Sequence, residues 1–494
     1  GEYVRTRGTS TTSGNLRLGD AYNGGNYNPS GYASSFDKMY RYLYGGVNRT
    51  NYVIENVRKM LPAASAASKP GLEAVIGEAR LLRGMVYFRL ISMWGDVPYI
   101  GNIIYSNDEV STLARTPIAQ VKDSIMADFT YAFDKLPVKG SAMGRAGKPA
   151  ALAFRGKLQL FWACWNKFGW PELDTFTPNA SEADKAYKAA AADFKSVIND
   201  YGLNLFRNGE PGDWGTMGNA DVLPNYYYLF IPSTGNPNTE GEMIMVFTHG
   251  GTGTGQGEEL MRDIAGRSHE GSQCWVSPRY EIADRYQSTI TGDFADKLIP
   301  TNPSTAGART KLNSAVNPAS YANRDYRMKS SIMWDYEMSV GMTSLKSTGW
   351  CPFIYKTWNA TVTIDGTKYI TYNTDGCNSG YVFRKFLRNY AGQGRSDGDY
   401  NWPVMRLADV FLMYAEATNE VNGPQADAID LVNRIRHRGN LPALAASKTA
   451  TKDAFFSAIE QERIVELLGE GQRSFDLRRW RALERVWGPP YGDG

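Results

Sequence analysis

Near its C-terminus the chain carries the segment RLADVFLMYAEATNE (406–420), in which apolar side chains recur three or four positions apart. That spacing forms one face of an α-helix, while Asp409 and Glu416 share the other face and Arg406 stands at the helix entrance. The segment ERIVELLGEGQRSFDLRRW (462–480) mixes acidic, basic and apolar residues in the same way. Charges of both signs at helical spacing usually form buried or half-buried ion pairs. We therefore assign these residues to structure and expect them to lock helices together.

Helical periodicity recurs on both sides of a less regular middle region. The pattern predicts helices over 36–61, 72–94, 117–136, 149–168 and 182–201, and again over 404–420, 424–438, 452–469 and 475–483. Between about 203 and 402 the chain is rich in Gly, Asn, Pro, Ser, Thr and aromatic residues, and strand-like runs are short. We expect one domain over 1–494, in which a helical scaffold (36–202 and 404–485) carries a loop-rich insertion (203–403).

The middle region contains two clear strand signals. One is the run MIMVF (243–247), and the other is a hairpin over 361–372, where Asp365 and Gly366 form a two-residue turn signal between β-branched runs. Cys351 and Cys377 bracket this hairpin, so their sulfur atoms could come close together. Whether they form a disulfide stays open, because such a bond persists only in an oxidising compartment.

The composition is that of a globular protein and argues against several functional classes. Of 494 residues, 42% are apolar and 21% charged, and no apolar run approaches the roughly 18 residues of a membrane span. The 54 basic and 51 acidic residues are interspersed, which argues against a nucleic-acid binder. Four cysteines without a CxxC pair and three scattered histidines argue against a metal site. The glycine-rich run after 247 lacks the patterns of phosphate loops, so no cofactor is expected.

Nine segments, in one order along the chain, resemble the SusD/RagB family of cell-surface nutrient-binding lipoproteins of the Bacteroidetes. They are EARLLRGMVYF with WGDVP (78–98), RTP before a helix ending in LP (115–137), GRAGKPAALAFRGKL (144–158), PRY with Asp284 (278–284), RDYR (324–327), RKF (384–386), RLADVFLMYAEATNE (406–420), NRIR (433–436) and ERIVE with GEGQRSFDLRRW (462–480). The resemblance covers roughly residues 36 to 480. Because nine matches fall in the family's order, the chain is identified as a SusD-like protein.

The resemblance implies a mainly α fold, in which helical pairs form a tetratricopeptide-like scaffold and a long irregular, partly β insertion forms the ligand face. It also implies a protein that is not an enzyme. Members typically sit on the outside of the outer membrane through an N-terminal lipidated cysteine and act as a lid over a SusC-like, TonB-dependent transporter. They capture oligosaccharides, or peptides in some branches, for import. Because the chain begins at Gly1, the lipid anchor is expected only in the full-length form.

Glycan binding requires aromatic rings that stack on the CH faces of sugars and polar side chains at their rim. In the family, such contacts tend to come from the loop after WGDVP and from the middle insertion. Mapped onto this chain, the resemblance implies ligand contacts by Tyr99, Asn102 and Tyr105 in the loop and by Trp275, Trp334, Asp335, Tyr336 and Trp350 in the insertion. The alternative for each tryptophan is packing against the scaffold.

The preferred hypothesis is non-catalytic capture of oligosaccharides at the cell surface and their delivery to a transporter. Three alternatives stay open. A RagB-like protein would capture peptides in a cleft lined by charged and aliphatic groups, without aromatic platforms. An α-helical glycoside hydrolase would place two carboxylates about 5–10 Å apart in a cleft and cleave the bound glycan. A helical-repeat adaptor would show no exposed aromatic platform.

Overall fold

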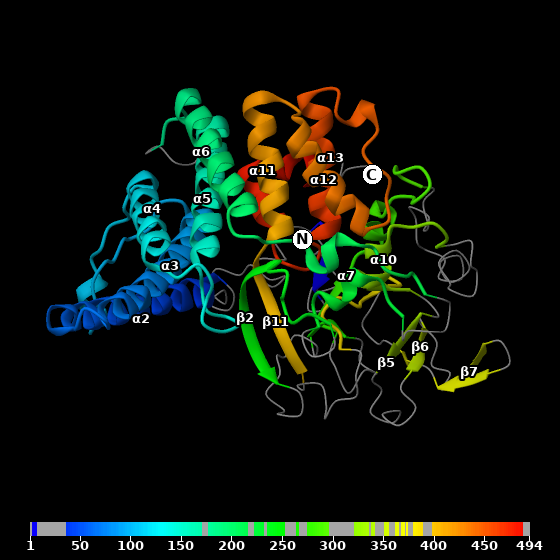
Figure 1. The fold of residues 1–494 in the computed structure, drawn as a ribbon, viewed down its shortest axis with the longest axis horizontal. Helices are drawn as coiled ribbons and strands as arrows, with labels where there is room; N and C mark the ends of the chain where they lie inside the picture. Colours follow the sequence, from blue (N-terminus) through cyan, green and yellow to red (C-terminus); the bar gives the residue numbers. More distant parts are fainter. Residues whose placement is uncertain are drawn as a thin grey trace.

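Five long helices follow one another in the N-terminal part of the chain and pack side by side in sequence order (Figure 1). They are α2 (Phe36–Met60), α3 (Lys69–Trp94), α4 (Ile118–Lys135), α5 (Lys148–Phe168) and α6 (Ala180–Asn199). Each lies where the sequence predicts a helix. The computed structural model describes residues 2–6, 36–169, 176–215, 222–231, 235–251, 263–265, 274–295, 321–334, 337–340, 350–354, 361–364, 367–370, 372–373, 379–388 and 398–487.

Signals at the helix ends explain where two of these helices start and stop. Pro70 and Pro149 stand in the first turns of α3 and α5. Proline lacks a backbone N–H, but in the first turn this group would have no hydrogen-bond partner within the helix. Gly95 and Gly169 follow the same helices with φ angles of 67° and 69°. Glycine adopts this left-handed conformation without the strain that a Cβ atom would cause, so the chain can turn sharply after each helix.

Two glycines let neighbouring helices approach closely. A Cβ atom at Gly84 of α3 would lie 2.5 Å from the ring of Phe129 in α4. A Cβ atom at Gly156 of α5 would lie 2.7 Å from the ring of Phe194 in α6. Both phenylalanines are fully buried. Each ring therefore occupies the space that a side chain would need, and the α3–α4 and α5–α6 pairs share the same kind of close contact.

Helices from the C-terminal part of the chain continue the row. They are α11 (Leu407–Asn422), α12 (Ala426–Arg438), α13 (Lys452–Glu466), α14 (Arg473–Arg479) and α15 (Leu483–Trp487). Helix α11 packs against α6 and α5, and one hydrophobic core contains side chains from α2 to α6 and from α11 to α14. The fold is thus mainly α, with helical pairs stacked in a tetratricopeptide-like scaffold. The helix predicted over 475–483 is divided between α14 and α15.

The beginning of α11 differs from the prediction. We predicted a helix from 404, but strand β11 (Gly398–Arg406) extends to the residue before α11 and pairs antiparallel with β2 (Met243–Gly251). In this pairing Met405 lies opposite Met245, and Arg406 lies opposite Met243. Pairing with β2 therefore keeps the backbone extended through an apolar run whose spacing alone also fits a helix.

The remaining elements are short and lie mostly in the middle of the chain. The strands are β1 (Val4–Thr6), β3 (Val276–Pro278), β4 (Ile332–Met333), β5 (Met338–Val340), β6 (Trp350–Ile354), β7 (Thr361–Ile364), β8 (Thr367–Ile370), β9 (Tyr372–Asn373) and β10 (Val382–Phe383). The short helices are α7 (Asn225–Tyr228) and α10 (Tyr326–Ser331), and single 3-10 turns are Leu61–Ala63, Asn107–Val110, Phe206–Gly209, Tyr280–Arg285 and Ala446–Lys448.

Strand pairing in this region is mostly antiparallel. The pairs are β1 with β3, β4 with β10, β5 with β6 and β7 with β8, while β6 and β9 are parallel. The strand predicted over 243–247 is confirmed as part of β2, and the predicted hairpin is confirmed by Ile364 opposite Thr367. The side chain of Cys351 and all of Cys377 lie outside the described residues, so the question of a disulfide between them stays open.

A buried network of ion pairs joins the middle region to the C-terminal helices. Its cations are Arg327, Lys385, Arg406, Arg436 and Arg438, and its carboxylates are Glu242, Asp325, Glu462, Glu466 and Glu470. No side chain among them is more than 3% exposed. The network contains as many cations as carboxylates and is therefore neutral as a whole. Pairing of this kind offsets part of the free energy that burial of each charge costs.

Glu466, the last residue of α13, stands at the centre of this network. Its Oε1 atom accepts hydrogen bonds from Arg438 at 2.8 Å and Arg406 at 3.1 Å, and its Oε2 atom accepts from Arg327 at 3.2 Å. Burial by itself would raise the pKa of Glu466, but the three guanidinium groups outweigh it and lower this pKa to about 2. Burial lowers the pKa of Lys385 to about 8, even though Glu470 pairs with it at 2.7 Å.

A second buried network ties α11 to α5, α13 and α14. Asp409 accepts from Lys157 at 3.0 Å and from Arg463 at 2.8 Å, and Arg479 forms a two-point contact with Glu416. Burial would raise the pKa of Asp409, but Lys157 and Arg463 hold it well below its usual range. The prediction that the acidic residues of the opening segment form buried ion pairs between helices is therefore confirmed.

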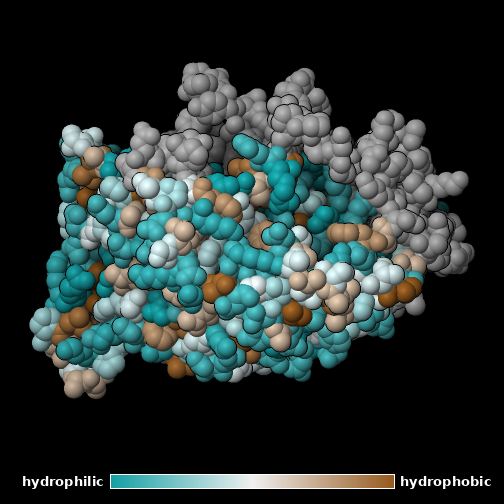
Figure 2. All heavy atoms as spheres, turned by 90° about the horizontal axis from the view of Figure 1, so that it is seen from above, coloured by the Kyte–Doolittle hydropathy of each residue, from teal (hydrophilic) through white to brown (hydrophobic). Residues whose placement is uncertain are grey.

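None of the described helices combines the length and the apolar character that crossing a membrane requires. On the face that Figure 2 shows, hydrophilic side chains predominate, and hydrophobic ones are scattered between them. Isolated apolar side chains of this kind are normal on globular proteins and do not by themselves mark a binding site.

Candidate functional site

The loop between α3 and α4 carries the first three predicted ligand contacts. It leaves α3 at Gly95 and returns so that Val97 and Thr116 form a β-bridge. The backbone N–H of Tyr99 donates to the Thr116 hydroxyl at 3.2 Å. The two ends of the loop are thus tied to each other.

Helix α2 provides a polar stripe that binds the backbone of this loop. Asn48 pairs with both the N–H and the C=O of Ile104, at 2.8 and 2.9 Å. Asn51 donates to the carbonyl oxygens of Ile100 and Asn102, at 3.1 and 2.8 Å. Glu55 accepts the Ile103 N–H at 2.8 Å. Because residues 48, 51 and 55 share one helix face, the stripe holds consecutive loop residues extended along the helix.

The structure exposes two of the three predicted loop residues. Tyr105 is 78% exposed, and Asn102 is also exposed, with its side-chain N–H₂ donating to the Ile103 carbonyl at 3.0 Å. The N–H groups of Tyr105 and Ser106 both donate to the Glu109 carboxylate, which fixes the backbone under the tyrosine. Tyr105 is therefore a large ring, presented to solvent from a backbone held by hydrogen bonds.

Tyr99 lies deeper and ends a row of aromatic rings. Its ring centroid is 4.8 Å from that of Tyr87, which contacts Tyr44 at 6.3 Å. Tyr44 contacts Tyr40 at 4.8 Å, and Tyr40 meets Trp94 edge-on at 5.2 Å. Tyr99 is only half-buried, so part of its surface remains available beside Asn102. These closely packed rings support the part of the loop that contains Tyr99.

The predicted ligand contacts in the insertion differ in their exposure to solvent. Trp275, directly before β3, is 42% exposed and stays a predicted ligand contact. Trp334 is 2% exposed, because its ring stacks on Tyr321 at 4.1 Å and on Trp214 at 6.0 Å. A ring covered in this way cannot stack on a sugar, so Trp334 is corrected to a core residue. Asp335, Tyr336 and the side chain of Trp350 lie outside the described residues.

The described site residues do not form one cluster. Tyr99 packs against the helical core, whereas Trp334 belongs to a second core formed by the middle region and α13. Sequence reasoning also missed an aromatic pair on the β2–β11 ribbon, where Phe247 lies opposite Trp402. Phe247 is 46% exposed, and the Trp402 ring stacks on Phe386 at 5.3 Å. The cross-strand register that pairs these rings could not be read from either strand alone.

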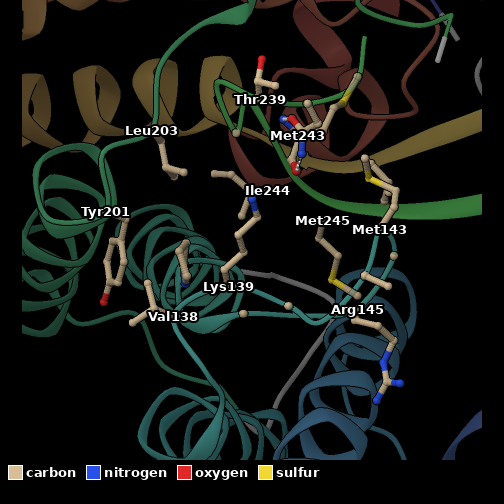
Figure 3. Close-up of a pocket in the computed structure, with 18 of the residues that line it drawn as sticks. Val138, Lys139, Met143, Arg145, Tyr201, Leu203, Thr239, Met243, Ile244 and Met245 are labelled. Atoms are coloured by element: carbon tan, nitrogen blue, oxygen red, sulfur yellow. Dashed lines mark hydrogen bonds between the residues drawn. The ribbon is translucent and has the colours of Figure 1, made fainter. Parts of the chain in front are cut away.

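A cavity of about 550 Å³ lies where the α4–α5 loop, the end of α6 and the start of β2 meet (Figure 3). Figure 3 shows Leu203, Ile244 and Met245 on its walls, and Lys139 runs from the loop towards Ile244. Tyr201 is its one aromatic lining residue among those that the structure describes. None of the predicted ligand contacts lines this cavity, which has the size of small-molecule sites.

The charged groups of the cavity differ in how they are held. Arg145 forms a two-point contact with Glu78. Glu240 is the single carboxylate among the described lining residues, and it accepts from the Arg207 N–H at 3.1 Å and the Thr239 hydroxyl at 2.8 Å. Burial would raise the pKa of Glu240, but these hydrogen bonds lower it. No group of three or more potential metal ligands occurs in the described part of the chain.

The fold and the sequence define the class of this protein. Residues 195–494 match the model of the SusD family, and residues 5–160 match a model described as "Starch-binding associating with outer membrane". The chain therefore belongs to the SusD family, and carbohydrate binding in association with the outer membrane is the activity that this classification carries.

Individual relatives agree with this assignment. SusD-like protein P25 of Formosa agariphila is 23% identical over 473 residues, which cover 95% of this chain and 74% of the relative. A SusD-like carbohydrate binding protein from Bacteroides fragilis has a crystal structure that matches with a TM-score of 0.68 at 20% identity, covering 100% of this chain and 82% of that one. A laminarin binding SusD-like protein matches with a TM-score of 0.57 at 19% identity, covering 92% and 80%. At these identities the structures establish a common fold.

Proposed function

We propose that this chain is a non-catalytic glycan-binding protein of the cell surface, which captures oligosaccharides and delivers them to a partner TonB-dependent transporter in the outer membrane. Family membership and a relative named for laminarin binding support the ligand class. Lipid anchoring of the full-length form and the transporter partner follow from the resemblance of the sequence to the family. In this proposal the loop after α3 is the principal contact surface for the glycan.

The observation that carries the proposal is the presentation of Tyr105. The ring is 78% exposed, yet the backbone beneath it is held by Glu109, and the preceding residue is held by Asn48. A ring fixed in this way loses little freedom when a sugar stacks on it, so less binding energy is spent on ordering the site. Asn102, exposed on the same loop, offers an amide to sugar hydroxyl groups.

Affinity electrophoresis and calorimetry against starch, xyloglucan, laminarin and a wider polysaccharide panel test this proposal. We expect at least one neutral glycan to bind and Tyr105→Ala to weaken its binding about tenfold, equivalent to about 1.4 kcal/mol. Tyr42→Ala is the matched control, because Tyr42 is 77% exposed on α2 and should leave affinity unchanged. If no glycan in the panel binds, glycan capture is wrong; if both variants bind like the parent, the loop is not the site.

Two further assays address the other parts of the proposal. Prolonged incubation with the bound glycan should produce no new reducing ends, whereas a glycoside hydrolase would release them. Co-purification of the full-length protein with an outer-membrane transporter should survive detergent extraction. Recovery of the protein alone after mild extraction would count against a stable transporter complex.

The cavity favours a second candidate function, the capture of short peptides. Its walls are lined by aliphatic and thioether side chains such as Leu203, Ile244 and Met245. Among the described lining residues the charged groups are Lys139, Arg145 and Glu240, and one residue is aromatic. That lining is what we expect of a RagB-like cleft. Calorimetry with short apolar peptides, repeated with Lys139→Met, decides this point. If the parent binds the peptides and Lys139→Met does not, the cavity is a peptide site; absence of binding by the parent excludes it for these peptides.

A further inference from the structure

Three polar side chains, one from each of three successive helices, form a hydrogen-bonded chain that ends at the loop carrying Asn102 and Tyr105. Asp128 of α4 contacts Arg83 of α3, and Arg83 contacts Asn51 of α2. Their exposed fractions are 1%, 6% and 0%. We infer that Asp128, Arg83 and Asn51 are positioning residues for ligand binding by this loop, an inference that rests on the proposed function.

The contacts fix the first two members of this chain in one geometry. The Arg83 Nε atom donates to one Asp128 oxygen at 2.8 Å, and Nη2 donates to the other at 2.7 Å. Such a two-point contact holds the guanidinium plane in a single orientation. The remaining nitrogen, Nη1, then points at Asn51 and donates to its Oδ1 atom at 2.9 Å.

This last hydrogen bond decides which way the Asn51 amide faces. A guanidinium group carries donors only, so it can meet only the oxygen of the amide, and the Nδ2 atom must face the opposite direction. There Nδ2 donates to the carbonyl oxygens of Ile100 and Asn102. The Asn51 amide therefore binds two carbonyl groups of the loop, and one of them belongs to Asn102, a predicted ligand contact.

Other side chains hold the neighbouring part of the loop independently. The Tyr87 hydroxyl accepts from the Ile100 N–H at 2.7 Å and donates to the Ile100 carbonyl at 3.1 Å. Asn48 binds Ile104, and Glu55 binds Ile103. Loss of Asn51 should therefore free the backbone at Asn102, while the loop stays attached at Ile100 and at Ile103 on either side of it. A role in positioning thus predicts weaker ligand binding in a protein that remains folded.

The scaffold offers a matched control for this inference. Arg155 of α5 binds Asp193 of α6 through the same two atoms, with Nε at 2.8 Å and Nη2 at 2.7 Å. This pair also joins neighbouring helices, but it does so between α5 and α6 and not at the loop after α3. Arg155→Lys should thus reproduce the general effect of weakening an interhelical ion pair, without the effect on the loop.

The experiment compares Asn51→Leu, Arg83→Lys, their double variant and Arg155→Lys. Peptide-level hydrogen exchange of residues 98–105 should be about tenfold faster in the first two variants and unchanged in Arg155→Lys. Affinity for laminarin and for starch, by calorimetry, should fall about tenfold in the same two variants. Because Arg83 acts through Asn51, the double variant should bind no more weakly than Asn51→Leu alone.

Several outcomes would overturn the inference. Unchanged exchange in Asn51→Leu would show that the chain does not hold the loop. Equal loss of affinity in Arg155→Lys, or additive losses in the double variant, would show a general effect on stability. If Asn51→Leu fails to fold, Arg83→Lys decides both measurements. If the parent binds neither laminarin nor starch and no glycan of the wider panel, the proposed function fails, while hydrogen exchange still decides whether the chain positions the loop.

Discussion

Replacement of Glu466 by glutamine should be one of the most damaging isosteric changes in this protein. Glu466 is 0% exposed and faces Arg327, Arg406 and Arg438. The amide keeps the shape of the carboxylate but removes its charge, so the neutral network is left with an excess positive charge in a buried place. Removal of one partner from a buried ion pair typically costs about 3–5 kcal/mol.

The pKa of Glu466 leads to a similar magnitude. It is lowered from 4.5 to about 2, and each pKa unit corresponds to about 1.4 kcal/mol, so ionised Glu466 contributes about 3 kcal/mol at pH 7. A carboxyl group with a lowered folded-state pKa stabilises the protein above its unfolded pKa and loses this effect as the pH falls through the folded value. The difference between parent and Glu466→Gln should therefore shrink to roughly half by pH 3.

Urea unfolding followed by circular dichroism at pH 7 and pH 3 measures both quantities. Asp184→Asn is the control, because its ion pair with Lys188 is exposed and should contribute less than about 1 kcal/mol. A loss below about 1 kcal/mol for Glu466→Gln at pH 7 would refute the reasoning. So would a difference between the two proteins that does not change between pH 7 and pH 3.

Two further predictions concern the scaffold and the buried amine. Gly84→Ala should destabilise the protein by about 1–3 kcal/mol in thermal unfolding, because the new Cβ atom would meet the Phe129 ring. Gly45→Ala in α2 is the control. A Cβ atom there would meet nothing within 4 Å, so this change should be neutral or slightly stabilising. Lys385 should make the free energy of unfolding rise between pH 8 and 10.5. Burial lowers the pKa of this amine to about 8 in the folded protein, so over this range the unfolded chain still binds a proton that the folded protein has lost. The rise should be absent in Lys385→Met, and an equal rise in both proteins would contradict it.

Much of the scaffold could be predicted because amphipathic helices repeat their pattern over many turns. The start of α11 could not be predicted, because an apolar run such as 403–405 fits a strand as well as a helix until its partner strand is known. The charged residues of the opening segment were assigned correctly, since mixed charges at helical spacing leave few alternatives to ion pairing. Asp409 and Glu416 are paired in the way that this argument requires.

The site was less predictable than the scaffold. Trp275 and Trp334 both lie in the middle region, yet one is 42% exposed and the other 2%. Their difference depends on Tyr321 and Trp214, whose approach to Trp334 is a tertiary contact. The polar stripe on α2 was visible in principle as residues spaced by three and four, but the loop that it binds lies about fifty residues away and has no periodicity of its own.

The contact between α6 and α11 has a consequence for synthesis on the ribosome. The chain emerges from its N-terminus, so α6 can pack on α5 early, but the part of its surface that contacts α11 has no partner until more than two hundred further residues have been translated. During that interval Glu466 has not yet been made. Residues that later join the buried network, such as Glu242 and Arg327, therefore remain hydrated. We infer that the middle region completes its folding late, when the final helices supply the opposite charges, and that a nascent chain stalled before α11 needs protection from aggregation.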